Sequence, residues 1–112
     1  MAANPAVPEP ELSLQTEKKG TETTLRCSGK LTSSTCGLLR TAVREHIPDT
    51  QMLVLDLSSV AYVDSSGLGE LVGVYVSTRN AGCKLKLINR NQRLKDLLNI
   101  TRLAPLFPEA EE

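Results

Sequence analysis

The stretch that most constrains the fold lies in the middle of the chain, where the apolar run 52–57 precedes the hexapeptide Asp-Ser-Ser-Gly-Leu-Gly at 64–69. The run is short and aliphatic, which favours a strand, and apolar residues recur at helical spacing after the hexapeptide. A strand, a polar turn and a helix are therefore predicted in that order. The turn places two hydroxyls at a helix start, where backbone N–H groups lack partners and the helix dipole is positive.

The residues before this unit predict two strands and a helix. Apolar and polar residues alternate over 12–17 and again over 23–28, and the turn candidate 18–20 joins them, which favours an antiparallel hairpin. A loop is predicted at 29–32. Ser33, Ser34 or Thr35 can cap the helix that follows, and Pro48 ends it. The central run 52–57 scarcely alternates, so we expect that strand to be buried on both faces.

The residues after the hexapeptide continue the same alternation of helix and strand. The central helix is predicted to end near Asn80, a strand follows at 84–88, Asn89 can cap a third helix, and a short turn or helix is expected at 102–107. The helical spacing predicts inward-facing residues in three sets: Leu39, Ala42, Val43 and Ile47; Leu68, Leu71, Val72, Tyr75 and Val76; and Leu94, Leu97 and Leu98.

The predicted order β-β-α-β-α-β-α indicates an α/β fold. Its β-α-β-α-β part implies parallel strands joined by right-handed crossovers, and the first hairpin adds an antiparallel edge. We expect a mixed, mostly parallel sheet covered by helices. Sites in such sheets lie beyond the carboxyl ends of the strands, which is where the turn at 64–66 is placed.

The length fits one small domain, which we place at 12–107. Residues 1–11 contain three prolines among alanine and glutamate, so a disordered tail is predicted there, and 108–112 is an acidic tail. The N-terminus lacks the charge and apolar core of a secretory signal. No apolar run approaches the ~20 residues of a membrane span, so no direct membrane insertion is expected.

The composition argues against a nucleic-acid binder, because 13 basic and 13 acidic residues give no net charge and only Tyr62, Tyr75 and Phe107 are aromatic. Cys27, Cys36 and Cys83 are odd in number and widely spaced, which favours reduced thiols in a cytoplasmic protein. The C-terminal half is basic: a solvated face explains this, and an acidic protein partner remains open. The residues concerned are Arg79, Lys84, Lys86, Arg90, Arg93, Lys95 and Arg102.

No catalytic, cofactor or metal motif is present. The single histidine, His46, falls late in its predicted helix, away from the serine turn, so no partnered base for a serine nucleophile is visible. Asp56 and Asp64 are eight residues apart across a strand end, which does not favour a metal site. Neither a P-loop nor a dinucleotide fingerprint occurs. The serine turn can be a phosphorylation site or only a capping sequence.

With the strand 54–57, the spacer 58–63 and the turn 64–69 in place, the chain resembles a STAS domain, and in particular the bacterial anti-sigma factor antagonists. The resemblance covers about 12–107, including the turn at Ala81 and Gly82 before the strand at Lys84. It implies a STAS-type sheet. It also implies a substrate and binding module that is not an enzyme.

The resemblance implies that Ser65 is the phosphorylated residue. The unphosphorylated domain would bind an anti-sigma factor that is also a serine kinase of the histidine-kinase-like ATPase type, and so release the sigma factor. Phosphorylation would break that complex, and a PP2C-type phosphatase would reset the protein. The residues expected to contact the partner are Thr32, Ser33, Asp64, Ser65, Ser66, Gly67, Leu68 and Gly69.

One segment departs from the family pattern. Gly29-Lys30-Leu31-Thr32 stands where the family often has Gly-Glu-Leu-Asp, so a lysine replaces the glutamate and a threonine the aspartate. This reverses the local charge and leaves the partner's identity open. It motivates an alternative, a non-switching STAS interaction subunit of a lipid-transport ABC complex or a stress-signalling assembly. A small enzyme with Ser65 or Ser66 as nucleophile is disfavoured, because it lacks a base.

Overall fold

The computed structural model describes residues 11–107. The predicted tails therefore lie outside the described residues, except for Glu11, whose backbone carbonyl accepts a hydrogen bond from the Lys30 N–H at 2.7 Å. The elements follow the predicted order, and two short 3₁₀ turns are added, at Ile47–Asp49 after the first helix and at Ala104–Leu106 after the third. They are β1 (Leu12–Lys19), β2 (Glu22–Leu31), α1 (Cys36–His46), β3 (Met52–Val63), α2 (Ser65–Asn80), β4 (Lys84–Ile88) and α3 (Gln92–Ile100).

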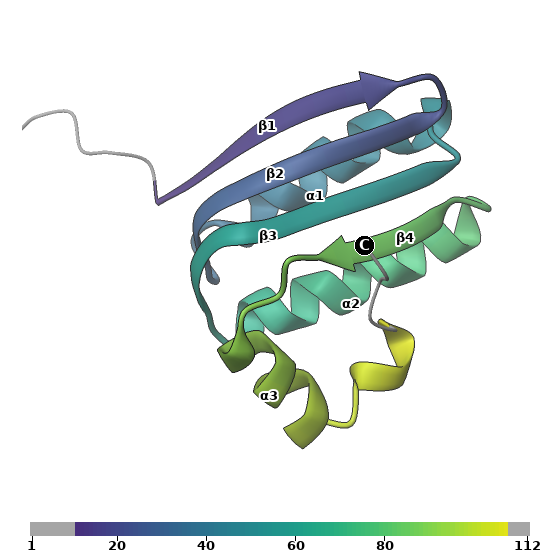
Figure 1. The fold of residues 1–112 in the computed structure, drawn as a ribbon. Coiled ribbons are helices and arrows are strands. Elements are labelled where there is room, and N and C mark those ends of the chain that lie inside the picture. The colour runs from purple at the N-terminus through teal and green to yellow at the C-terminus, as the bar shows by residue number, and fades with distance from the viewer. Residues whose placement is uncertain (1–10, 108–112) are drawn as a thin grey trace, which may run out of the picture.

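The sheet has the predicted mixed topology. Its strand order is β1-β2-β3-β4; β1 pairs with β2 antiparallel, and the other two pairings are parallel. Because the strand order never reverses, right-handed crossovers bring successive helices to the same face of the sheet. Figure 1 shows α1 and α2 packed against that one face. The other face, which we call the open face, carries no helix within residues 11–107.

β3 is therefore buried differently from the prediction. Leu53, Leu55 and Leu57 face the helices and are at most 2% exposed, whereas Met52 and Asp56 on the open face are only half-buried. Val54 is 6% exposed although no helix covers it, because β2 and β4 flank it in register. The prediction that both faces of this strand are buried is wrong for the strand as a whole.

β2 and β3 extend further than the sequence pattern predicts. The predicted loop at 29–32 is mostly strand, and β3 continues to Val63. The pairing of these two strands shifts register between Arg26 and Ser28 and again between Gly29 and Lys30. Each irregularity breaks the two-residue alternation. Leu57, Val60 and Val63 are consequently all buried at intervals of three, a spacing that conceals a strand.

α2 buries a stripe slightly different from the predicted one. Leu68 and Leu71 are buried as expected, but Val74 replaces Val76, which is 47% exposed. The inward stripe begins at Gly67 and continues through Leu71, Val74 and Thr78. The apolar residue at 76 misled the prediction because it extends the hydrophobic pattern onto the outer surface of the helix.

α3 begins two residues later than predicted. Asn91, not Asn89, caps it, since its side chain accepts a hydrogen bond from the Leu94 N–H at 2.8 Å. Asn89 instead adopts a positive φ of 60°, and its side-chain amide donates to Asp56 Oδ1 at 3.0 Å. The two asparagines thus have separate roles: Asn89 attaches the β4–α3 loop to the open face, and Asn91 starts the helix.

Asp56 provides a test of this attachment. Burial acts to raise its pKa, but hydrogen bonds from Asn89 and Ser58 and the charge of Arg26 outweigh that effect and hold the pKa below its usual value. A carboxylate whose folded-state pKa is lowered stabilises the protein above its unfolded-state pKa of ~3.9 and loses that effect as the pH falls through the folded-state value. Asp56→Asn should therefore lower the free energy of unfolding by roughly 1–3 kcal/mol at pH 7.

Urea unfolding at pH 7 and at pH 3 measures this effect. The deficit of Asp56→Asn should shrink at pH 3, which lies below the unfolded-state pKa of ~3.9, because part of the stabilisation by the charge is lost there. Asp49→Asn removes an exposed carboxylate from the turn after α1 and serves as the matched control, with little expected change. A deficit that stays the same at both pH values would contradict the assigned role of the charge.

Candidate functional site

The serine turn joins β3 to α2 at the carboxyl edge of the sheet. Asp64 has an extended backbone conformation and is the N-cap: its Oδ1 accepts a hydrogen bond from the Gly67 N–H at 2.9 Å. The first intrahelical bond runs from the Leu68 N–H to the Asp64 carbonyl. The aspartate side chain thus satisfies the N–H group of the third helical residue, and neither serine caps the helix.

Ser65 and Ser66 are the first two residues of α2, and both are exposed. Among residues 11–107, their backbone N–H groups have no hydrogen-bond partner. They lie at the positive end of a 16-residue helix, which favours negative charge. The geometry therefore presents two accessible hydroxyls where an added phosphate suits the fold.

The two glycines of the turn differ in their surroundings. Gly67 is buried against the end of β2, and a Cβ there would overlap the Leu31 carbonyl oxygen and lie 2.8 Å from its carbon. Gly69 is exposed, and a Cβ there would meet nothing within 4 Å. Leu68 is buried in the core. Of the residues predicted to contact a partner, Gly67 and Leu68 thus lie inside the fold, and Gly69 lies on its surface.

The segment after β2 lies directly beside this turn, because the Asp64 N–H donates to the Leu31 carbonyl at 3.2 Å. Thr32 is half-buried and Ser33 is exposed, so the structure brings both predicted contact residues to the same edge as Ser65. Thr35 is the residue before α1, but its hydroxyl does not cap the helix. It accepts from the Thr32 N–H and donates to the Lys30 carbonyl, which holds the segment in a compact turn.

Two contacts at this edge were not predicted. Glu11 Oε1 accepts a hydrogen bond from the Ser34 hydroxyl, which lies 3.1 Å from the Thr32 hydroxyl. Arg40 of α1 donates to Glu70 of α2, with Nη2 2.7 Å from Oε1. Glu70 is only 8% exposed, and a charged residue is rarely buried unless it is paired. No local sequence signal pairs residues thirty positions apart, so only the fold shows this link between α1 and α2.

Among the described residues, the candidate bases lie away from the serines. His46 is the last residue of α1, and α1 begins at the carboxyl edge, so the histidine lies at the opposite edge of the sheet. Asp56 is engaged by Asn89 and Ser58 on the open face and does not meet Asp64. Within residues 11–107, no group of acidic, cysteine or histidine side chains could hold a metal ion. No helix in that range is long and apolar enough to cross a membrane.

All three cysteines are free thiols, as predicted. Cys27 and Cys83 are buried, and Cys36 is half-buried at the start of α1. Burial, with a smaller effect from the nearby charge of Asp56, raises the pKa of Cys27 to about 12. A thiol with so high a pKa stays protonated at neutral pH and is a poor nucleophile.

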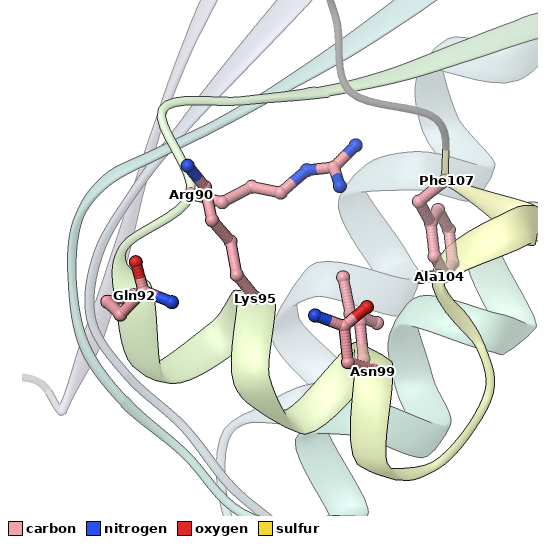
Figure 2. A pocket seen from close by; sticks show the side chains of 7 residues that line it. Arg90, Gln92, Lys95, Asn99, Ala104 and Phe107 are labelled. Atoms are coloured by element: carbon pink, nitrogen blue, oxygen red, sulfur yellow. The ribbon is translucent and has the colours of Figure 1, made fainter.

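A pocket of about 260 Å³ lies away from the serine turn, between α3 and the C-terminal turn. Figure 2 shows Arg90, Gln92, Lys95 and Asn99 on one side, facing Ala104 and Phe107. None of the predicted site residues lines it. The exposed members of the predicted site, Ser65 among them, lie instead at the carboxyl edge of the sheet.

The sequence matches the family model described as the STAS domain over residues 13–112. It is 39% identical over 56 residues to the anti-sigma-B factor antagonist of Listeria monocytogenes, covering 50% of this chain and 49% of that protein. The chain thus spans about half the length of this curated relative. It is 30% identical over 86 residues to the anti-sigma F factor antagonist of Paenibacillus polymyxa, covering 75% of this chain and 74% of that protein.

The fold is similar to that of the Bacillus cell fate determinant SpoIIAA, solved in its phosphorylated form. The TM-score is 0.70 at 18% identity, over 89% of this chain and 93% of that chain, and at such identity the likeness concerns the fold alone. The family match extends from β1 past the last described residue, so it includes the whole sheet, all three helices and the serine turn. The chain belongs to the STAS domain family.

Proposed function

We propose that this protein is an anti-sigma factor antagonist, controlled by phosphorylation of Ser65. Unphosphorylated, it binds an anti-sigma factor that is also a serine kinase of the histidine-kinase-like ATPase type, and the sigma factor is released. Phosphorylation ends that binding, and a PP2C-type phosphatase restores it. All of these steps take place in the cytoplasm. The names of the two relatives support the antagonist role, and the phosphorylated form of SpoIIAA supports control by phosphate.

The observation that carries the proposal is the exposure of Ser65 at the first position of α2. A kinase can reach this hydroxyl without unfolding any element. The added charge of roughly −1.5 to −2 lies at the positive helix end, so the fold tolerates it. The Asp64 carboxylate is already bonded to the Gly67 N–H, which holds the turn in place in both states. The domain thus acts as a substrate and a binding partner, and it catalyses no step itself.

The test uses the histidine-kinase-like ATPases encoded in the same genome, each purified and incubated with the protein and ATP. We expect one of them to add a single phosphate, detected by intact mass and mapped to Ser65. Ser65→Ala should abolish the modification. Ser66→Ala, the matched control on the adjacent exposed residue, should retain it. A purified PP2C-type phosphatase should remove the phosphate.

If none of these kinases binds or modifies the protein, the proposed function fails. Co-purification with a transporter ATPase subunit, with Ser65 unmodified, would instead support the non-switching interaction subunit. The exposed Lys30 beside the site is the feature that keeps that second function under consideration.

A further inference from the structure

The carboxyl edge presents a second group of exposed side chains beside the serine turn. Tyr62 of β3 is 40% exposed, and Lys30 of β2 is its registered neighbour on the open face. The Arg93 guanidinium of α3 lies over the Tyr62 ring, with its central carbon 5.2 Å from the ring centroid. We call these three residues the Tyr62 patch. Tyrosine and arginine are the residue types most often found as anchors of protein interfaces.

A hydrogen bond between α3 and β3 holds the Tyr62 patch in place. Asn91 caps α3 and also donates from its side-chain amide to the Val60 carbonyl of β3 at 3.1 Å. The first turn of α3, which carries Arg93, is therefore fixed to the strand that carries Tyr62. The cation–π contact with the ring leaves the N–H groups of the guanidinium able to bind a carboxylate. Such preorganisation reduces the entropy lost on binding.

The charges in the patch lack a partner within the described fold. Among residues 11–107, neither the Lys30 ammonium nor the Arg93 guanidinium forms an ion pair. Arg93 also lies in the first turn of α3, which contains no acidic residue, so it adds positive charge to the positive end of a helix. Asp64 and Glu11 at this edge are bonded to Gly67 and Ser34, and Asp96, three residues after Arg93 on α3, accepts a hydrogen bond from the Gln92 side chain. A positive charge is unfavourable at the start of a helix, so the position of Arg93 indicates a role in binding in addition to its contact with Tyr62.

We propose that the Tyr62 patch is a docking surface for an acidic patch on the partner protein, with Tyr62 in an apolar slot and Lys30 and Arg93 against carboxylates. This rests on the proposed function, because the partner meant is the anti-sigma kinase. Two cations and one ring are too few for nucleic acid, where a protein typically contacts about 6–10 phosphates.

An acidic partner also explains how a phosphate would break the complex. Ser65 follows Tyr62 by three residues, so its Cα lies at most about 11 Å from that of Tyr62 along the chain. This upper bound is somewhat longer than the screening length of roughly 8 Å at physiological salt, so salt weakens but does not abolish the interaction at shorter separations. A phosphate there would repel carboxylates that the patch attracts. Electrostatics would then favour binding of the partner before phosphorylation and oppose it afterwards.

The experiment measures binding to the kinase that modifies the wild-type protein. Lys30→Glu and Arg93→Glu should each raise the Kd at least tenfold and reduce its dependence on salt, because a charge attraction has become a repulsion. Lys84→Glu makes the same charge change on an exposed residue at the start of β4, on the opposite edge, and should change the Kd less than twofold. Circular dichroism melting curves check that all three variants fold.

Replacing an acidic residue of the kinase with lysine should restore binding to Arg93→Glu. A Kd and salt dependence within twofold of wild type for both patch variants would overturn the inference, while leaving the proposed function intact. Loss of binding to anionic vesicles or duplex DNA in these variants, with kinase binding unchanged, would assign the patch to those ligands and also overturn it. If no kinase binds the wild-type protein, the proposed function is what fails.

Discussion

Gly67→Ala should be among the most destabilising single substitutions in this protein. Its Cβ would overlap the Leu31 carbonyl oxygen and lie 3.0 Å from the Leu31 side chain. The closest atoms belong to the backbone of the last residue of β2, which pairs with Val63 of β3, so they cannot move aside as a flexible side chain would. Overpacking of this kind costs about 3 kcal/mol at the upper end of its usual range. For a domain of this size we expect a Tm roughly 10–20 °C below wild type.

Gly69→Ala is the matched control, because it makes the same change two residues along the same helix. A Cβ at Gly69 meets nothing within 4 Å, and alanine in a helix is more stable than glycine by roughly 0.5–1 kcal/mol. The two variants should therefore move the Tm in opposite directions in calorimetry or circular dichroism. Equal and small effects from both would mean that α2 does not dock on β2 as closely as the structure shows.

This close contact explains how one surface is built from distant parts of the sequence. Because Gly67 lacks a side chain, α2 approaches β2 closely enough for the Asp64 N–H to bond the Leu31 carbonyl. That bond places Ser65 beside Thr32 and its hydroxyl network. Gly67, expected to contact a partner, thus has an internal role in packing α2 against the end of β2.

The sequence predicted the parts of the fold that depend on regular periodicity. The element order, the parallel pairing and the antiparallel edge are confirmed, as is the resemblance to the STAS family. The element order and strand pairing depend on the spacing of apolar residues, which a local irregularity does not erase. The position of the serine turn at a strand end also follows from order alone, because parallel strands joined by helices end at one edge.

The failures lie where tertiary contacts override a local pattern. The irregular pairing of β2 and β3 buries residues at intervals of three, so the continuation of β3 through 58–63 gave no alternating signal. Asn89 and Asn91 are equally good helix caps by residue type. In the structure Asn89 bonds to Asp56, and Asn91 caps α3. Three contacts join residues far apart in sequence: the Arg40–Glu70 pair, the bond from Ser34 to Glu11, and the cation–π contact of Arg93 with Tyr62. No one-dimensional pattern contains these contacts.

Ser65→Asp should separate the stability of the protein from its binding. An acidic side chain at the start of α2 interacts favourably with the helix dipole, so the free energy of unfolding should rise by roughly 0.3–1 kcal/mol or stay unchanged. In the proposed complex the same charge would face a partner surface complementary to a neutral hydroxyl, and like charges brought together at an interface cost several kcal/mol. We expect the Kd for the anti-sigma kinase to rise at least ~100-fold, which corresponds to about 2.7 kcal/mol.

Ser65→Asn isolates the charge in this experiment, because asparagine has nearly the same shape as aspartate and is neutral. Its Kd should stay within about tenfold of wild type, since a one-residue change of shape at an exposed position costs roughly 1.4 kcal/mol or less. Ser66→Asp moves the same charge one residue along the helix and should weaken binding less than Ser65→Asp. Tight binding by Ser65→Asp would contradict control by phosphate. Equal loss by Ser65→Asp and Ser65→Asn would show that the partner rejects size at this position, so that charge could not be the signal.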